Sequence, residues 1–319
     1  PKLMNAEWVS LFKRLQVGTE EQSATHVASA VNEKITALFN FCIISVSGDD
    51  ASNFLESQLT SDIINLKKLN GRYAGYCNPK GRLIATPFVI RLENGFALLV
   101  PEDLSEEFAT RLSRFILRAK VKVRINDSQL IVGLINRLTP IDNLTRIAAI
   151  IGSPIIRMND TQHIILCAPE QIESQWSKLK SQLSVCDEED WHLETIRNGH
   201  VNICNATKEQ FIPQMIQLEK AGGVSFTKGC YPGQEIVART KYLGSVKRKL
   251  HHFSSETTIS VGSAILNEDE TKVGVVCVVA STNGPLGSSE GLAVIRADET
   301  GRSHYTASDM TLIKNLKPI

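Results

Sequence analysis

One ten-residue stretch, residues 226–235 (FTKGCYPGQE), sets the tightest limit on how this chain can fold. It joins a short β-like run to a helix-like run. Pro232 suits the first position of a helix, because its missing N–H would have no intrahelical partner there. Gly229 and Gly233 allow the backbone to turn tightly and to approach another group closely. The stretch therefore predicts a strand, a tight turn and a helix, with Cys230 in the turn.

Cys230 is the residue of this turn that can carry chemistry. Unpaired N–H groups and the dipole at a helix N-terminus favour a negative charge, and Lys228 adds a positive charge two residues before the cysteine. Such surroundings lower a thiol pKa from about 8.5 to about 3.5–7.5 and so produce a thiolate. The alternative is a buried, inert cysteine. The flanking residues favour a reactive or ligand-bearing thiol.

The segment around the turn resembles the signature K-G-C-Y-x-G-Q-E of the YgfZ family, which is related to the T-protein (aminomethyltransferase) of the glycine cleavage system. Residues 228–235 match that signature, and the match extends through residues 211–214, 222–226 and 236–239. A second patch, residues 54–62 (FLESQLTSD), resembles the family's F-L-Q-x-Q-L-T-x-D segment. A match with fixed glycines and a cysteine is more specific than a lone glycine pattern.

The resemblance implies a folate-binding accessory protein that acts in the assembly or repair of iron–sulfur enzymes and thereby in tRNA modification. Tetrahydrofolate would be its cofactor, and iron–sulfur enzymes such as a tRNA methylthiotransferase would be its partners. Cys230 would be the working thiol and Lys228 its electrostatic partner. Arg239 would bind an anionic group or a loop carbonyl, and the loop would be shaped by Gly229, Tyr231, Gly233, Gln234 and Glu235.

By the same resemblance, a folate pterin would lie between aromatic side chains at Trp191 and Phe41. Core packing is the alternative for Phe41, and a contact at the start of a helix is the alternative for Trp191. The T-protein segment that matches residues 81–86 carries aspartates, one of which helps the substrate amine and tetrahydrofolate to react. Here the positions read Ala85 and Thr86, and neither can act as a carboxylate base. A classical aminomethyltransferase is therefore not expected, and enzymatic activity stays open.

Two other functions compete with this hypothesis. The first is a folate-dependent one-carbon transferase, which the Ala85 and Thr86 pair disfavours. The second is an RNA-binding module that uses residues 239–249, where five Lys or Arg residues surround Tyr242. A solvated linker face explains such a run equally well, and one short basic stretch in a neutral chain is weak support for nucleic-acid binding.

The overall composition narrows the class of protein. The 319 residues carry a net charge of +1, which gives no global electrostatic case for nucleic acid or membrane binding. No apolar run reaches the length of about 20 residues that spans a bilayer, and residues 1–10 lack a signal-peptide layout. Seven cysteines occur singly, without a C-x-x-C pair or zinc-like spacing. We expect reduced thiols, no metal site and a cytoplasmic protein.

The order of predicted elements indicates an α+β fold, because hairpins and helices alternate without regular βαβ units. The resemblance to the T-protein implies interleaved α+β domains and a small C-terminal β-barrel. The predicted units are a helical lead (1–30), the first part of a folate-binding-like domain (31–125), a second α+β domain (126–190), the signature-loop region that completes the first domain (191–249) and the barrel (250–319).

Several local patterns predict single elements. Asp49 or Asp50 can cap a predicted helix over residues 51–59, and a hairpin is expected around residues 78–81. A strand is expected at residues 146–149. A helix is expected over residues 191–198, directly after the acidic cluster at 187–190.

Overall fold

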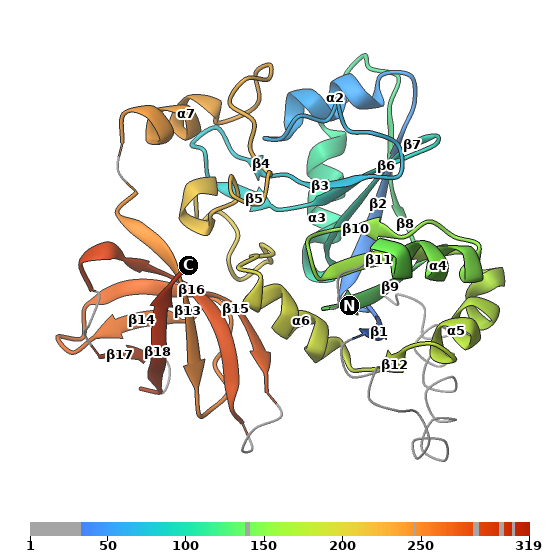
Figure 1. The fold of residues 1–319 in the computed structure, drawn as a ribbon. Helices are drawn as coiled ribbons and strands as arrows, with labels where there is room; N and C mark the ends of the chain where they lie inside the picture. Colours follow the sequence, from blue (N-terminus) through green and yellow to red (C-terminus); the bar gives the residue numbers. More distant parts are fainter. Residues whose placement is uncertain (1–32, 138–140, 245, 283–286, 300–302, 308–309) are drawn as a thin grey trace.

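The computed structural model describes residues 33–137, 141–244, 246–282, 287–299, 303–307 and 310–319. Within these ranges the chain has a mixed α+β fold, with two five-stranded sheets, a two-stranded hairpin and a closed barrel (Figure 1). The predicted α+β class and the predicted C-terminal barrel are both confirmed. The helical lead predicted over residues 1–30 lies outside the described residues.

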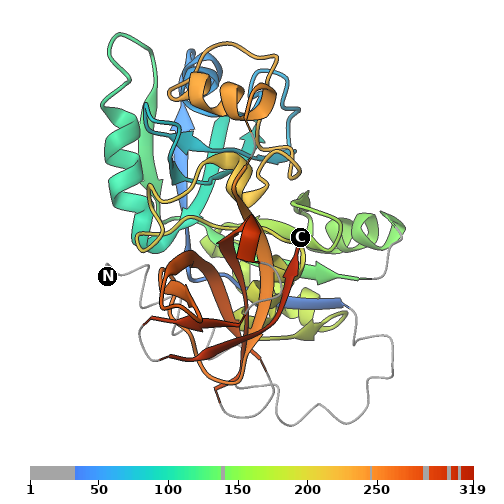
Figure 2. The ribbon, with the colours of Figure 1, turned by 90° about the vertical axis from the view of Figure 1, so that its left-hand side faces the viewer.

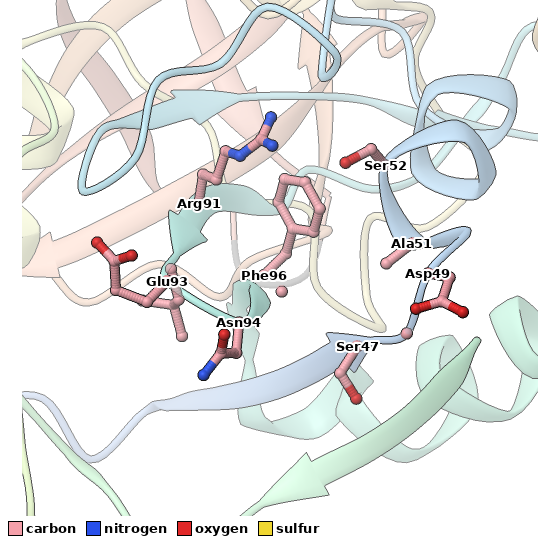
Figure 3. Close-up of a pocket in the computed structure, with 11 residues that line it drawn as sticks. Ser47, Asp49, Ala51, Ser52, Arg91, Glu93, Asn94 and Phe96 are labelled. Carbon is pink, nitrogen blue, oxygen red and sulfur yellow. The ribbon is translucent and has the colours of Figure 1, made fainter. Parts of the chain in front are cut away.

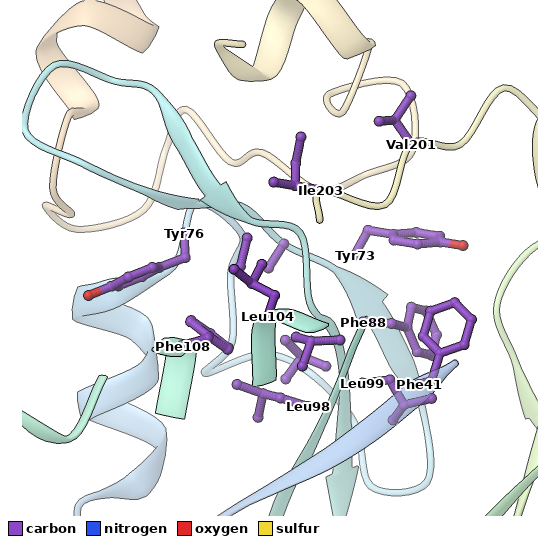
Figure 4. Packing of buried hydrophobic residues seen from close by; sticks show 14 of the residues in the cluster. Phe41, Tyr73, Tyr76, Phe88, Leu98, Leu99, Leu104, Phe108, Val201 and Ile203 are labelled. Carbon is purple, nitrogen blue, oxygen red and sulfur yellow. The ribbon is translucent and has the colours of Figure 1, made fainter. Parts of the chain in front are cut away.

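The first sheet positions the predicted cysteine loop, and its strand order is β3-β6-β7-β2-β8. The strands are β2 (Phe41–Ser47), β3 (Gly71–Tyr73), β6 (Phe88–Leu92), β7 (Gly95–Pro101) and β8 (Lys122–Asn126). The helices of this part are α2 (Ala51–Gln58) and α3 (Glu102–Ser113). The predicted hairpin around residues 78–81 is formed by β4 (Tyr76–Cys77) and β5 (Leu83–Ala85). Aromatic and aliphatic side chains fill the main core beside this sheet (Figure 4).

The second sheet has the order β10-β11-β9-β1-β12. Its strands are β1 (Glu33–Ala37), β9 (Leu130–Asn136), β10 (Ile156–Arg157), β11 (Gln162–Cys167) and β12 (Ser184–Val185). Strand β1 falls in the predicted unit 31–125 but pairs with β9 and β12, which fall in the predicted unit 126–190. The covering helices are α4 (Ile141–Ile151) and α5 (Ile172–Lys180), which follows a short 3-10 turn, η1 (Pro169–Gln171).

Residues 146–149, expected as a strand, lie inside α4. Ile147 and Ile151 are four residues apart and both are buried in the core of this domain. That spacing is typical of a helix. Residues 146–149 alone span about one helical turn, so they are too few to show the period.

A long connection links the sheets to the barrel. It contains α6 (Glu188–Arg197), the 3-10 turn η2 (Pro213–Ile216) and α7 (Gln234–Tyr242). Three residues of the acidic cluster, Glu188, Glu189 and Asp190, form the first turn of α6 rather than preceding it, which suits the positive end of the helix dipole. In Figures 1 and 2, α7 lies above the barrel, and Figure 1 shows α6 beside it.

The barrel has the closed order β13-β16-β15-β14-β17-β18. Its elements are β13 (Arg248–Ser255), β14 (Ala264–Asn267), β15 (Lys272–Ser281), β16 (Ser289–Arg296), η3 (Ala297–Glu299), β17 (His304–Thr306) and β18 (Leu312–Pro318). Arg197 of α6 donates to both carboxylate oxygens of Glu290, at 2.8 and 3.3 Å. This ion pair ties the barrel to α6.

Among the helices of the described ranges, none combines the length and the hydropathy that crossing a bilayer requires.

Candidate functional site

The structure brings together the two patches that carry the family resemblance. Thr60 lies in the first patch and is fully buried. Its hydroxyl donates to the carbonyl of Gly223 at 2.5 Å and accepts from the N–H of Gly75 at 2.7 Å. Its carbonyl accepts from the N–H of Ser225 at 2.8 Å. The segment that leads into the cysteine loop is therefore fixed to the residues that follow α2.

Lys228 makes a second connection between these patches. Its ammonium donates to the carbonyls of Glu56, Leu59 and Ser61 at 2.5, 2.6 and 3.0 Å. The Glu56 carboxylate lies 3.4 Å away, and the Lys228 side chain is only 1% exposed. Carbonyls at the end of a helix lack intrahelical partners and carry the negative end of the dipole. Lys228 therefore caps the C-terminal end of α2.

These contacts give Lys228 a role in holding the loop. Burial lowers the pKa of the Lys228 ammonium, although Glu56 opposes the shift. The expectation that this charge acts on the thiol of Cys230 stays a prediction. Tyr231 lies on the other side of the cysteine and is 6% exposed, with its ring centroid 5.5 Å from the Lys228 ammonium. The two neighbours of the Gly229–Cys230 pair are thus anchored in the protein.

Gly233 is required by the backbone at the end of the loop. Its φ is +81°, and a Cβ at this position would lie 2.5 Å from the carbonyl oxygen of Asn78. Helix α7 begins at Gln234, with Gly233 as its N-cap. The expectation that Pro232 opens the helix is therefore wrong, because the left-handed turn at Gly233 comes between them. A Cβ at Gly229, by contrast, would meet no atom within 4 Å.

Cys230 is the one exposed thiol among the seven cysteines, all of which lie in the described ranges and are free. Cys204 is partly exposed and the other five are buried. Burial raises the pKa of Cys77, Cys167 and Cys186 to about 12, so these thiols stay protonated. Solvent and reagents reach Cys230 first.

The remaining signature residues lie on α7. Gln234 is half-buried, while Glu235 and Arg239 are exposed. Gln214 of η2 contacts this helix, because its side-chain amide donates to the carbonyl of Val237 at 2.7 Å. The side chain of Arg239 has no hydrogen bond or ion pair to another described residue, so its guanidinium is available to an outside group.

The predicted folate pair lies elsewhere and is covered. Trp191 is 2% exposed and Phe41 is 8% exposed. The Trp191 ring lies over Gly133, where a Cβ would come within 2.7 Å of it. Phe41 stacks on His192, with centroids 6.2 Å apart. Neither ring presents an open face, so the pair does not fit a pterin in this conformation, and its role in folate binding stays a prediction.

A titratable group beside Phe41 was missed by sequence reasoning. Glu188 accepts from the N–H groups of Phe39 and Asn40 at 3.1 and 3.0 Å. Burial raises the pKa of this carboxyl to about 7. The acidic cluster at 187–190 was the available signal, but its pattern does not distinguish the buried member. Glu188 fixes the link between β1 and β2.

Residues at the positions of the T-protein aspartates are structural here. Ala85 is fully buried and Thr86 is 1% exposed. The Thr86 hydroxyl donates to the carbonyl of Val201 at 3.2 Å and accepts from the N–H of Ile203 at 2.9 Å. Thr86 thus fastens the segment after α6 onto the first domain. Figure 4 shows Val201 and Ile203 of that segment beside the core.

A surface pocket of about 410 Å³ opens at the N-terminal end of α2 (Figure 3). Residues 47–49 and 91–96 line it, together with Ala51 and Ser52. None of the predicted site residues lines this pocket, which lies at the opposite end of α2 from the Lys228 contacts. Within the described part of the chain, no three His, Cys, Asp or Glu side chains group closely enough to hold a metal ion.

Comparison with known proteins gives both a sequence and a fold relationship. No family model matches the chain. The tRNA-modifying protein YgfZ of Aliivibrio fischeri (strain MJ11) is 28% identical over 265 residues, which cover 80% of each chain. The protein of the same name from Hamiltonella defensa subsp. Acyrthosiphon pisum (strain 5AT) is 27% identical over 310 residues, which cover 87% of this chain and 92% of that protein.

Among solved structures, the glycine cleavage system aminomethyltransferase T from Bartonella henselae superposes with a TM-score of 0.67 and 17% identity. The match covers 90% of this chain and 85% of that one. This likeness shows a shared fold. The chain is thus similar in sequence to tRNA-modifying proteins named YgfZ and in fold to aminomethyltransferase T, which confirms the resemblance to the YgfZ family.

Proposed function

We propose that this protein acts in tRNA modification, as a folate-binding accessory protein that supports iron–sulfur enzymes through the thiol of Cys230. One observation carries the proposal: Cys230 is exposed on a loop whose flanks are both fixed. Lys228 anchors one flank to α2, and Gly233 packs the other against the hairpin turn. A thiol held in this way meets a partner without the cost of ordering the loop first.

An iron–sulfur species on Cys230 would need ligands from a client protein. One thiolate fills one of the four ligand positions of an iron–sulfur cluster. The described residues form no group of three metal-binding side chains. A client would therefore supply the remaining ligands if Cys230 holds an iron–sulfur species. A one-carbon unit or a mixed disulfide on Cys230 would need no further ligand.

Folate is the proposed cofactor because the chain resembles YgfZ proteins in sequence and aminomethyltransferase T in fold. Phe41 and Trp191 are covered and leave no open ring face for a pterin. Ala85 and Thr86 supply no carboxylate, which disfavours the alternative of a folate-dependent one-carbon transferase. An assay of aminomethyl transfer to tetrahydrofolate tests that alternative, and enzyme-like rates would favour it. The seven free thiols suit the reducing cytoplasm as the site of action.

A complementation experiment tests the role of Cys230. A bacterial strain whose own relative has been deleted receives the wild-type protein, Cys230→Ser or the matched control Cys204→Ser. Methylthiolated nucleosides are then quantified by mass spectrometry of tRNA digests. We expect the wild type and Cys204→Ser to restore them and Cys230→Ser to fail. Full restoration by Cys230→Ser would remove this thiol from the function.

A further inference from the structure

The outer face of α7 and the segment that follows it, residues 236–244 and 246–249, form a surface that we call the α7 ridge. In Figure 1 it runs along the edge of the molecule from α7 to β13. Three large apolar side chains are exposed on it, with Ile236 at 38%, Tyr242 at 68% and Leu243 at 86%. Exposed charge runs are commonly solvated, but a solvated linker does not account for this apolar surface.

The ridge concentrates positive charge in a nearly neutral chain. Residues 236–255 contain five Lys or Arg residues and no Asp or Glu, whereas the whole chain has a net charge of +1. Lys241 pairs with Glu219 at 3.3 Å. The other four cations are exposed and have no ion pair with another described residue, namely Arg239, Lys247, Arg248 and Lys249. Unpaired cations along one edge are complementary to a polyanion.

Tyr242 is held in a way that leaves its ring available. It meets Phe226 edge to face, with centroids 6.0 Å apart and planes at 70°. The Lys241 ammonium lies 5.4 Å from the Phe226 ring centroid, which braces the same contact. A positioned aromatic ring beside cations is the arrangement on which unpaired bases stack while their phosphates are neutralised.

The ridge is continuous with the cysteine loop. Phe226 precedes Cys230 by four residues, and α7 begins at Gln234, four residues after Cys230. The space above Gly229 is open. A ligand seated on Tyr242 and Phe226 therefore lies on the segment that carries the exposed thiol.

We propose that the α7 ridge binds unpaired RNA, with a base stacked on Tyr242 and phosphates on Arg239, Lys247, Arg248 and Lys249. This inference rests on the proposed function, because tRNA modification makes RNA the available polyanion. An acidic protein also complements the charge, but it would leave the exposed ring of Tyr242 unexplained. RNA accounts for both the ring and the cations.

Fluorescence anisotropy tests the ridge with a labelled RNA hairpin that has a single-stranded loop, and with a fully paired duplex of equal length. We expect the full-length protein to bind the hairpin more tightly than the duplex. Tyr242→Ala should weaken hairpin binding about tenfold, while Tyr242→Phe retains it. The variant Lys247→Gln/Arg248→Gln/Lys249→Gln should reduce the slope of log affinity against log salt by about 2.

A matched charge control is available on β8 and the turn before it, where Arg118→Gln/Lys122→Gln/Arg124→Gln removes three exposed cations that have no ion pair with another described residue, at a distant edge. Thermal unfolding verifies that every variant is folded. An equal loss of affinity in this control would overturn the inference, as would full hairpin binding by Tyr242→Ala. Polyglutamate that binds as tightly as the hairpin would assign the ridge to an acidic protein instead.

The failure of this inference is distinguishable from failure of the proposed function. Cys230→Ser should bind the hairpin as the wild type does, because the thiol is not part of the ridge. If the wild-type protein does not bind the hairpin, the ridge proposal is wrong. The role of Cys230 would still be decided separately by the complementation experiment.

Discussion

The loop that carries Cys230 and the aromatic pair Phe41 and Trp191 differ in one decisive respect. Cys230 is exposed, whereas Trp191 is 2% and Phe41 is 8% exposed. The loop that exposes the thiol is held at its flanks by Lys228, which contacts α2, and by Gly233, which packs against the hairpin turn, and Gly229 leaves the surface open. The burial of Trp191 follows from Gly133 on another strand. Local chemistry is readable in a motif, while access to an aromatic ring depends on distant elements.

The largest expected effect would come from Trp191→Ala. Removing a fully packed indole should lower the free energy of unfolding by about 3–5 kcal/mol, measured by urea denaturation. Trp176→Ala is the matched control, because Trp176 is fully buried in the core of the second domain. Similar losses would confirm Trp191 as a core residue. A small loss of stability together with abolished tetrahydrofolate binding would instead make Trp191 a ligand contact. The contrast between an accessible Cys230 and a covered Trp191 would then fail.

The next effect concerns the anchor of the loop. Lys228→Met should lower the free energy of unfolding by about 2–3 kcal/mol, because it leaves buried carbonyls without a donor. Hydrogen exchange should accelerate in residues 223–233. Lys220→Met, at an exposed lysine nearby, should change stability by less than about 0.5 kcal/mol. Unchanged stability and exchange in Lys228→Met would contradict the anchoring role and leave the electrostatic role as the better explanation.

The smallest effect compares the two glycines of the loop. Gly233→Ala should cost about 1–3 kcal/mol, since an alanine must adopt a left-handed φ and meet the Asn78 carbonyl. Gly229→Ala has open space and should stay within about 0.5 kcal/mol. Thermal unfolding of both variants provides the comparison. Equal shifts in Tm would contradict the tightly packed, left-handed turn at Gly233 and the open space at Gly229.

The sequence predicts those elements whose signals are local. Helix α2 and the hairpin around residues 78–81 are formed as expected, because a Pro-Lys-Gly turn acts on its own neighbours. Asp50 stands at the N-cap of α2, but its carboxylate accepts from the N–H of Lys120 at 2.7 Å and makes no capping bond to the helix. Strand β1 could not be assigned to its sheet, because its partner β9 lies almost a hundred residues later. The same reasoning applies to Lys228, whose acceptors are mainly backbone carbonyls and leave no trace in residue identity.

The fold class and the signature loop were thus accessible from the sequence, whereas the contacts that fix the loop were not. The start of α7 shows the limit within a single motif. Pro232 and Gly233 both mark a helix boundary, and the left-handed turn at Gly233 decides where the helix begins. The close approach of the Asn78 carbonyl from the hairpin leaves no room for a side chain at position 233.

The central claim is that one thiol is held open on an anchored loop while the buried ones are inert. Brief iodoacetamide treatment of the native protein, followed by mass-spectrometric mapping of each cysteine, tests it directly. We predict that Cys230 is alkylated first and that Cys77, Cys167 and Cys186 are modified only after unfolding. If Cys230 reacts no faster than Cys77 in the folded protein, the claim is contradicted.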